Sequence, residues 1–222
     1  MNYGLTGATG KMGKEILNVF REHSLVLAVN SKGEELQGTP QVMVDFSSPG
    51  ALDRTLALCA RHGAALVIGT TALQETDFTK LREYGKTAPV VQSYNFATGI
   101  NILKIILREY TPLFQDWDLE ITETHHNKKK DAPSGTAILL RDATGRDCPT
   151  HSLRLGGVPG DHSVLFANEG EVVTFSHRSI ARSVFAIGAL RAALFTLSAP
   201  AGFYTFEDVL SGVSPNRVKG LK

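Results

Sequence analysis

The sequence predicts an α/β fold with two domains, a parallel-sheet domain and a smaller α+β domain with an open antiparallel sheet. Up to about residue 95, apolar runs alternate with helical patterns, which is typical of a parallel sheet wound by right-handed crossovers. From about His151 onward, strand-like runs lie between Gly, Pro and Asp turns, which indicates an antiparallel sheet. A last apolar helix follows, and we expect it to return to the first domain.

The first domain is predicted from strands that alternate with helices, apart from two consecutive strands at residues 24–30 and 41–47. Short apolar runs bounded by turn residues predict strands at residues 2–7, 24–30, 41–47, 64–71 and 89–95. Apolar residues at helical spacing predict helices at residues 10–23, 48–63 and 73–87. Pro49 suits the first turn of the second helix, because its missing N–H would have no partner there.

The pattern of expected helices and strands changes in the second domain. We expect a long helix at residues 99–114, a strand with partial alternation at 117–126 and a short helix at 136–144. Further strands are expected at residues 151–157, 162–168 and 171–178, and the returning helix at 182–198. The expected domains are therefore residues 1–96 with 183–222, and residues 97–182.

Composition excludes several classes of protein. Of 222 residues, 42% are hydrophobic, which is enough for a sizeable core. The formal net charge of +1 argues against nucleic acid as the main partner, because such proteins usually carry a large basic excess. No apolar segment reaches the length of a membrane span, and the first residues lack the pattern of a signal peptide. Cys59 and Cys148 lack metal-like spacing, and Cys59 is expected in the core. We expect a cytoplasmic protein that binds neither nucleic acid nor membrane.

A glycine-rich turn follows the first predicted strand. Gly7, Gly10 and Gly13 form G-x-x-G-x-x-G between a strand and a helix. Glycines permit a tight turn and a close approach to a pyrophosphate, which the N-terminus of the helix then binds. Lys11 adds a positive charge. This context predicts a Rossmann-like dinucleotide site, and the alternative is a tight turn that binds no ligand.

The end of the second predicted strand bears on the choice of cofactor. Dinucleotide folds often place a carboxylate there to bind the ribose. Here Asn30, Ser31 and Lys32 occupy that place, and no carboxylate precedes Glu34. Lys32 and Ser31 favour a 2′-phosphate, so the cofactor is NADPH or NADH with a lean toward NADPH. An ordinary polar loop is the alternative.

Two further loops follow predicted strands, at the edge where open α/β sheets bind ligands. They are residues 69–71 and 93–96. Each loop alone is more often an ordinary loop than a site. Small or amide residues at the ends of three predicted strands together favour a ligand-binding site. The expected cofactor-binding residues are Gly7, Ala8, Thr9, Gly10, Lys11, Met12, Lys32, Gly69, Thr70, Thr71, Ser93, Tyr94, Asn95 and Phe96.

The stretch "ETHHNKKKDAPSGTA", residues 123–137, concentrates positive charge before a helix. Pro133 disfavours helix at the residue before it, and Ser134 is a plausible N-cap. Gly135 and Thr136 would then begin a helix whose N–H groups bind an anion, and nearby cations would suit a substrate with more than one carboxylate. Adjacent histidines followed by lysines lack zinc spacing, so we expect no metal. The alternative is a solvated basic loop.

This stretch resembles the dihydrodipicolinate reductase family, whose motif is E-x-H-H-x-x-K-x-D-A-P-S-G-T-A. Every specified position matches, and "GATGKMG", "VDFSSP", "VIGTT" and "NFATGINILKIIL" resemble other landmarks of the family. The resemblance extends nearly from end to end. It implies reduction of 4-hydroxy-tetrahydrodipicolinate to tetrahydrodipicolinate with NADH or NADPH, in lysine biosynthesis. Water is lost, hydride adds to C4 of a conjugated imine, and a proton is delivered to C3.

The resemblance also implies roles for particular residues. His125 takes the place of the proton donor, and Lys129 that of a second donor or an electrostatic stabiliser. His126 takes a substrate-binding place, and Gly135 with Thr136 would hold a substrate carboxylate. The family further implies that residues 97–182 bind substrate and build a homotetramer. The open sheet after His151 points the same way, because its alternate apolar residues would need cover.

Two other functions stay open. A relative could reduce a different imine, and a non-catalytic module could bind NAD(P) as a sensor. The presence of both His125 and Lys129 argues against a sensor, which needs no proton donor. Residues 30–41 and 143–152 are shorter than in typical family members, and the sequence does not say whether dehydration of the substrate is catalysed.

Overall fold

The computed structural model describes residues 1–212 and divides them into two compact units. Unit 1 comprises Met1–Phe96 together with the described residues from Phe185 onward, and unit 2 comprises Ala97–Val184. The end of the first predicted domain, residues 213–222, lies outside the described residues.

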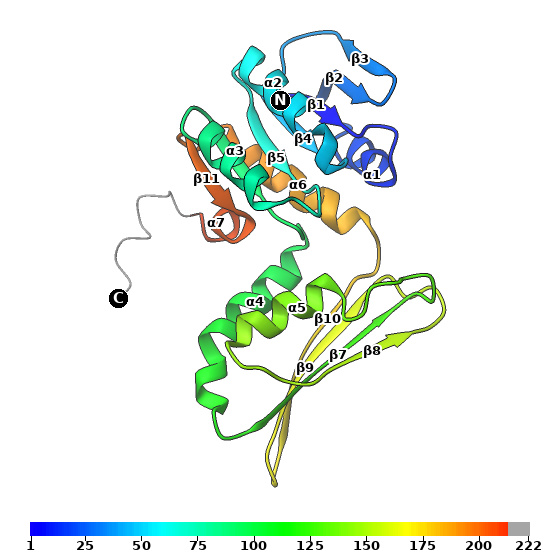
Figure 1. The fold of residues 1–222 in the computed structure, drawn as a ribbon, viewed down its shortest axis with the longest axis vertical. Coiled ribbons are helices and arrows are strands. Elements are labelled where there is room, and N and C mark those ends of the chain that lie inside the picture. The colour runs from blue at the N-terminus through cyan, green and yellow to red at the C-terminus, as the bar shows by residue number, and fades with distance from the viewer. Residues whose placement is uncertain (213–222) are drawn as a thin grey trace. The chain divides into compact units, whose positions relative to one another are not determined.

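Unit 1 is built on a seven-stranded sheet (Figure 1). The strands are β1 (Asn2–Thr6), β2 (Ser24–Asn30), β3 (Gly33–Leu36), β4 (Val42–Asp45), β5 (Ala65–Ile68), β6 (Pro89–Gln92) and β11 (Gly202–Thr205). Their order is β11-β6-β5-β4-β1-β2-β3, and every pair is parallel except β2 with β3. The order reverses direction beside β1, which places a crevice between the ends of β1 and β4.

Helices cover both faces of this sheet, because its central strands are apolar on both sides. The helices are α1 (Lys11–Val19), α2 (Leu52–His62), α3 (Glu75–Gly85), α6 (Ser183–Thr196) and α7 (Phe206–Ser211), with a 3₁₀ turn η1 (Pro49–Ala51) before α2. Val42 and Val44 of β4 join the core that includes residues of α1, α6 and α7. Met43, between them, joins the core that includes residues of α2 and α3. Alternation along one strand thus supplies both cores.

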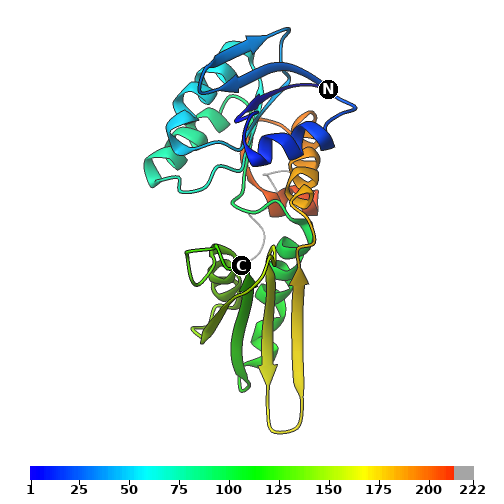
Figure 2. The ribbon, with the colours of Figure 1, turned by 90° about the vertical axis from the view of Figure 1, so that its right-hand side faces the viewer.

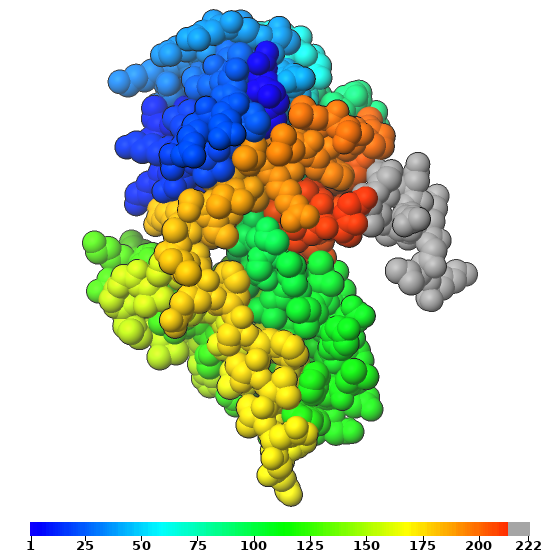
Figure 3. Space-filling model, turned by 180° about the vertical axis from the view of Figure 1, so that it is seen from behind, coloured from blue at the N-terminus to red at the C-terminus, as the bar shows by residue number. Residues whose placement is uncertain are grey.

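The helix α6 packs through small residues. Ala186, Ala189, Ala192 and Ala193 are all fully buried. Larger side chains on other sides of the helix, Ile187 and Leu194 among them, are exposed. The helix is the orange segment at the surface of unit 1 in Figure 3. Alanine lets a helix lie close to the layer beneath it, so an apolar helix here need not be enclosed on all sides.

Unit 2 is a four-stranded sheet with two helices on one face (Figures 1 and 2). Its elements are α4 (Thr98–Tyr110), η2 (Thr111–Phe114), β7 (Asp118–His125), α5 (Gly135–Thr144), β8 (Thr150–Arg154), β9 (Asp161–Ala167) and β10 (Val172–Arg178). The strand order is β10-β9-β7-β8. Ile121, Val164 and Phe166 are buried, and Phe114 stacks on Phe166 with ring centroids 4.5 Å apart.

The predicted fold class is confirmed, with three corrections. The strand β8 pairs with β7 in parallel, so the second sheet is mixed rather than wholly antiparallel. The strand β3 and the pair β11 and α7 were missed: β3 is polar and gains its place by pairing with β2, and β11 is too short for a periodic pattern. The helices α4 and α5 cover only part of the apolar residues of the second sheet: Val164 and Phe166 are buried, whereas Leu153 and Val172 are exposed.

Two smaller expectations are also settled. Cys59 lies on α2 and is fully buried in the core, as predicted. Among the residues that the structure describes, no helix combines the length and apolar character needed to cross a membrane.

Candidate functional site

The glycine turn after β1 is compact, and its glycines are required by space. Gly7 has φ +88°, a conformation that side chains disfavour. A Cβ on Gly13 would lie 2.3 Å from the carbonyl oxygen of Gly7. Gly10 N donates to that same oxygen at 2.9 Å, and α1 begins at the next residue. The turn therefore delivers the N-terminus of α1 directly to the end of β1.

A pocket of about 680 Å³ opens at this point. It lies where β1, β2 and β4 end, which is the crevice that the strand order predicts. Its lining residues are Thr6, Gly7, Thr9, Gly10, Lys11, Met12, Val29, Asn30, Ser31, Phe46, Ser47, Ser48, Gly50, Ala51 and Arg54. The glycine cradle, the helix N-terminus and the two cations Lys11 and Arg54 fit a dinucleotide with its phosphates.

A buried carboxylate stabilises the part of the pocket wall that follows β4, around Ser47. Asp45, at the end of β4, is fully buried and accepts hydrogen bonds from the hydroxyls of Ser47, Thr55 and Thr70 at 2.5–2.9 Å. Ser47 N also donates to Thr70 Oγ1 at 3.0 Å. Thr70, a predicted cofactor-binding residue, is 3% exposed and is tied to Ser47 of the pocket lining both directly and through Asp45.

Other predicted cofactor residues also stand outside the described lining of the pocket. Gly69 leaves room for the Phe46 ring, which a Cβ would meet at 2.2 Å. Phe96 is buried and packs on Phe46 with centroids 5.5 Å apart. Lys32 N donates to Asn30 Oδ1 at 2.8 Å beside the pocket. The remaining residues outside the lining are Ala8, Thr71, Ser93, Tyr94 and Asn95. Arg54, which does line it, was missed because nothing in the sequence placed the start of α2 beside the end of β2.

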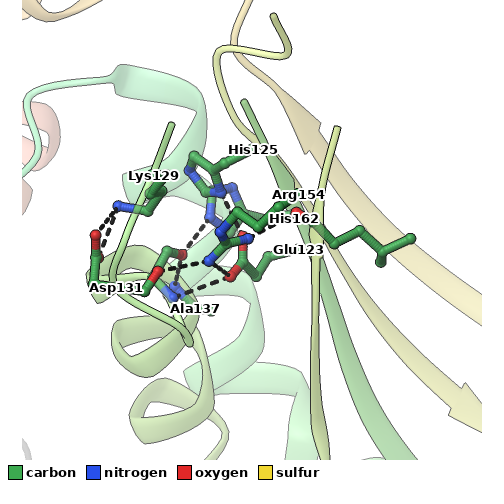
Figure 4. Close-up of polar contacts among 9 residues, drawn as sticks. Glu123, His125, Lys129, Asp131, Ala137, Arg154 and His162 are labelled. Carbon is green, nitrogen blue, oxygen red and sulfur yellow. Dashed lines mark hydrogen bonds and ion pairs between the residues drawn. The ribbon is translucent and has the colours of Figure 1, made fainter. Parts of the chain in front are cut away.

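A second polar cluster lies in unit 2 around Glu123 of β7 (Figure 4). Glu123 is 1% exposed and shares the helix-covered face of the sheet with His125, two residues further along the strand. Arg154 of β8 donates to it twice, from Nη1 to Oε2 at 2.9 Å and from Nη2 to Oε1 at 2.7 Å. His125 Nδ1 contacts Oε2. Ser134 N donates to Oε1 at 3.2 Å.

The hydrogen bonds keep Glu123 ionised. Burial by itself would raise the pKa of this carboxyl, but donation from Arg154, Ser152 and His125 outweighs burial and lowers the pKa to about 2. A buried carboxylate with these donors can act only as an acceptor at neutral pH. The proton between Glu123 and His125 therefore resides on His125.

His162 of β9 completes the cluster. It lies opposite Glu123 in the β7–β9 register, is 5% exposed, and its Nε2 lies 3.1 Å from Ser134 Oγ. Burial lowers the pKa of His162 to about 4, and the charge of His125 adds to this, so His162 is neutral at physiological pH. Its ring meets that of His125 edge-on, with centroids 5.1 Å apart.

The basic loop and the start of α5 adjoin this cluster. Ser134 caps α5 as predicted, accepting from Ala137 N at 3.2 Å, and α5 begins at Gly135 with Thr136 second. Lys129 Nζ donates to both Asp131 oxygens at 2.7 and 2.9 Å. Arg154 Nη2 also donates to Asp131 O at 2.7 Å, so it ties the basic loop to the sheet.

The structure thus brings several of the predicted substrate residues into or beside one cluster, which also contains three polar residues that the sequence did not single out. His126 O accepts from Lys129 N at 3.0 Å, and His125, Ser134 and the α5 start share Glu123. Glu123, Arg154 and His162 were not predicted. The alternation of β7 could have revealed Glu123, because it points to the same side as His125. Arg154 and His162 come from strands whose pairing the sequence did not specify.

A doubly wound sheet with a glycine cradle and a separate cluster with a histidine and a lysine define a dinucleotide-dependent oxidoreductase. The family models for the N-terminus and the C-terminus of dihydrodipicolinate reductase match residues 1–96 and 99–210. The chain belongs to the dihydrodipicolinate reductase family, which confirms the resemblance seen in the sequence. Such a family of Rossmann-type dehydrogenases implies a nicotinamide cofactor.

Similar proteins agree with this assignment. A 4-hydroxy-tetrahydrodipicolinate reductase of Thermosipho africanus is 53% identical over 212 residues, covering 95% of this chain and 98% of that protein. One from Zymomonas mobilis is 37% identical, with 93% and 96% covered. The dipicolinate-bound dihydrodipicolinate reductase from Paenisporosarcina sp. TG-14 has the same fold, with a TM-score of 0.79 at 21% identity, over 92% of this chain and 97% of that chain.

Proposed function

We propose that this protein reduces 4-hydroxy-tetrahydrodipicolinate to tetrahydrodipicolinate, using NADPH or NADH, in diaminopimelate and lysine biosynthesis. The observation that carries the proposal is the cluster of unit 2, in which one buried carboxylate holds both His125 and the start of α5. A proton donor and an anion-binding helix start then act on one small dicarboxylate. The names of the curated relatives supply the identity of that substrate.

Gly7, Gly10 and Lys11 would hold the nicotinamide cofactor, which would supply the hydride for C4 of the conjugated imine that remains after loss of water. His125 delivers a proton to C3. Gly135 and Thr136, at the α5 N-terminus, bind one carboxylate, and His126 binds the substrate beside them. Lys129 stabilises the negative charge that develops as hydride arrives, because a fixed cation acts most strongly where charge appears. Lys129 already has a partner in Asp131, so the substrate must compete for its ammonium group.

The preference for NADPH over NADH belongs to this proposal. Arg54 lines the pocket and donates from Nη1 to Asn30 O at 3.2 Å, close to the backbone of Lys32. Glu34 is 3.9 Å from Arg54 Nη2, so a carboxylate is near, but it already faces a cation. Arg54 and Lys32 are two cations near the expected site of the ribose, and the carboxylate of Glu34 faces Arg54. This arrangement favours binding of a 2′-phosphate.

Three further expectations are retained as part of the proposal. Residues 1–96 and 183–222 act as the dinucleotide-binding domain, and residues 97–182 bind substrate and form the tetramer contacts. The homotetramer now rests on the family resemblance and on the open face of the second sheet, which carries polar residues such as Ser163 and Ser176. A cytoplasmic location suits the free thiols of Cys59 and Cys148.

A coupled assay with freshly made substrate tests the function. We expect loss of nicotinamide absorbance that depends on substrate, with a higher kcat/KM for NADPH than for NADH. Tight cofactor binding without turnover would instead support the sensing module. Faster turnover of an imine that lacks one carboxylate would support the relative with a different substrate.

A further inference from the structure

We propose that Glu123, held by Arg154, is a positioning residue that fixes His125 with its proton on Nδ1 and directs Nε2 to the substrate. The proposal rests on the proposed role of His125 as proton donor. It adds two residues to which the family motif and the sequence gave no function.

The first step is the state of the carboxylate. Glu123 is 1% exposed and accepts two hydrogen bonds from Arg154 and one from Ser134 N. With this set of donors it stays ionised and holds no proton to give. His125 Nδ1 therefore donates to Oε2, and a second proton, carried on Nε2 of the imidazolium form, is the one that passes to the substrate.

The second step is the direction of Nε2. A Cβ built on Gly160 would lie 3.0 Å from His125 Nε2, so this nitrogen lies beside a residue without a side chain. On another side, the His162 ring packs edge-on against His125. Because His162 is neutral, it limits rotation of the ring without repelling the proton of a charged imidazole. The ring is thus contacted by Glu123 and His162, and its Nε2 lies beside Gly160, where any side chain would approach it closely.

The third step is the coupling of two parts of the site. Arg154 Nη2 donates to Glu123 Oε1 and also to Asp131 O in the basic loop, both at 2.7 Å. Ser134 N, one residue before α5, donates to the same Glu123 oxygen. The carboxylate therefore fixes the distance between the proton donor and the helix start that would bind the substrate.

Stability alone does not account for this arrangement. Replacing a buried ion pair by apolar side chains of similar volume is often neutral or stabilising. The neighbouring residues on the same face, Leu119 and Ile121, show that β7 packs well with apolar side chains. An ionised Glu–Arg pair beside a histidine is explained by what it does to the histidine.

The test compares Glu123→Gln with Glu120→Gln. Glu120 is a matched control, because it lies on the same strand and pairs with His151 Nε2 at 3.0 Å, but in an exposed position. In E123Q the amide oxygen turns to Arg154 and the NH₂ group to His125, which must then accept at Nδ1 and carry its proton on Nε2. Donation from Nε2 while Nδ1–H is retained requires the imidazolium cation, which the Glu123 carboxylate stabilises and a neutral amide does not, so we expect kcat to fall roughly 10²–10⁴-fold with KM changed only a few-fold. The alkaline limb of the kcat/KM profile should move to lower pH. E120Q should change none of these.

Nitrogen NMR of histidine-labelled protein gives the decisive readout, with His125 assigned by its loss in His125→Asn. At alkaline pH, where the ring is neutral, we expect Nδ1–H in the wild type and Nε2–H in E123Q. A wild-type spectrum with the proton on Nε2, or an E123Q protein with unchanged tautomer and pH profile, would overturn the proposal. If E123Q does not fold, the wild-type spectrum still decides. Full activity of His125→Asn would refute the role of His125 as donor, whereas the tautomer result would still report on Glu123.

Discussion

Arg154 and Glu123 are joined by two parallel hydrogen bonds between adjacent strands, at 2.9 and 2.7 Å, with the carboxylate wholly buried. A two-pronged guanidinium–carboxylate pair fixes both partners in one plane, which a lysine could not do. This pair stands at the centre of the candidate site, and several expected outcomes follow from it.

Removing the arginine should destabilise the fold. In Arg154→Met, Glu123 remains buried without its main counter-charge, so we expect the free energy of unfolding to fall by about 3–5 kcal/mol. Arg178→Met is the control, because Arg178 forms an exposed pair with Asp161 and should cost about 0–1 kcal/mol. Urea unfolding at pH 7 measures both. Equal losses in the two variants would show that burial of Glu123 does not decide the energetics.

The two predicted catalytic residues should differ in their kinetics. His125→Gln removes proton delivery and should lower kcat by roughly 10²–10⁴-fold with little change in KM. Lys129→Met should lower kcat and also raise KM, because its ammonium can bind the ground-state dianion. The double variant should lose less than the product of the single losses, since both residues serve one step. Lys128→Met, at an exposed position in the same loop, should have only a small effect. If kcat fell only a few-fold in either single variant, the basic stretch at residues 123–137 would be a solvated loop without a catalytic role.

Cofactor choice should depend on the cations near the ribose end of the pocket. Arg54→Ala should weaken the binding of NADPH by about 1.5–3 kcal/mol, the usual value of a hydrogen bond to a charged group. The binding of NADH should weaken much less. Lys32→Ala should act in the same direction. Arg61→Ala provides the control, because Arg61 lies on the same helix, exposed and outside the pocket lining. Dissociation constants from nicotinamide fluorescence report this without turnover. Equal losses for both cofactors would place the 2′-phosphate elsewhere.

A planar pyridine dicarboxylate should inhibit competitively with the imine substrate. It would present its carboxylates to His126, the basic loop and the start of α5. Thr136→Val should weaken it by about 1–3 kcal/mol, because a hydrogen bond to a charged group is lost. Inhibition constants from initial rates measure this effect. Inhibition competitive with the nicotinamide instead would mean that the dicarboxylate does not bind at α5.

His162 should make stability depend on pH. Its pKa is about 4 in the folded protein and 6.5 in the reference state, so the unfolded chain binds a proton first as the pH falls. The contribution of His162 to the free energy of unfolding is therefore complete above about pH 6.5. It is lost progressively as the pH falls toward 4. His162→Gln should therefore show a smaller fall in Tm between pH 7.5 and pH 5 than the wild type. His151→Gln, at an exposed histidine, should follow the wild type. If both variants show the same fall in Tm between pH 7.5 and pH 5 as the wild type, protonation of His162 does not cause the pH dependence.

Local pattern and motif predicted most of the fold and part of the site. Apolar runs located the strands, Gly7, Gly10 and Gly13 located the cofactor turn, and Ser134 was recognised as the cap of α5. These features are local, because a strand, a tight turn or an N-cap is specified by residues within a few positions of one another. The sequence by itself thus determined the order of most elements, the class of cofactor and the residues of the basic loop.

The tertiary structure decided what depends on contacts between distant residues. Only strand pairing placed β8 parallel to β7, and with it Arg154 beside Glu123, 31 positions apart. Only sheet order placed Arg54 in the pocket and brought Thr70 to Asp45, 25 positions away. A side chain's chemistry can be read from its letter, but its pKa, tautomer and partner depend on burial and on which strands become neighbours. Those are set by the global packing of apolar faces, and no local sequence pattern encodes them.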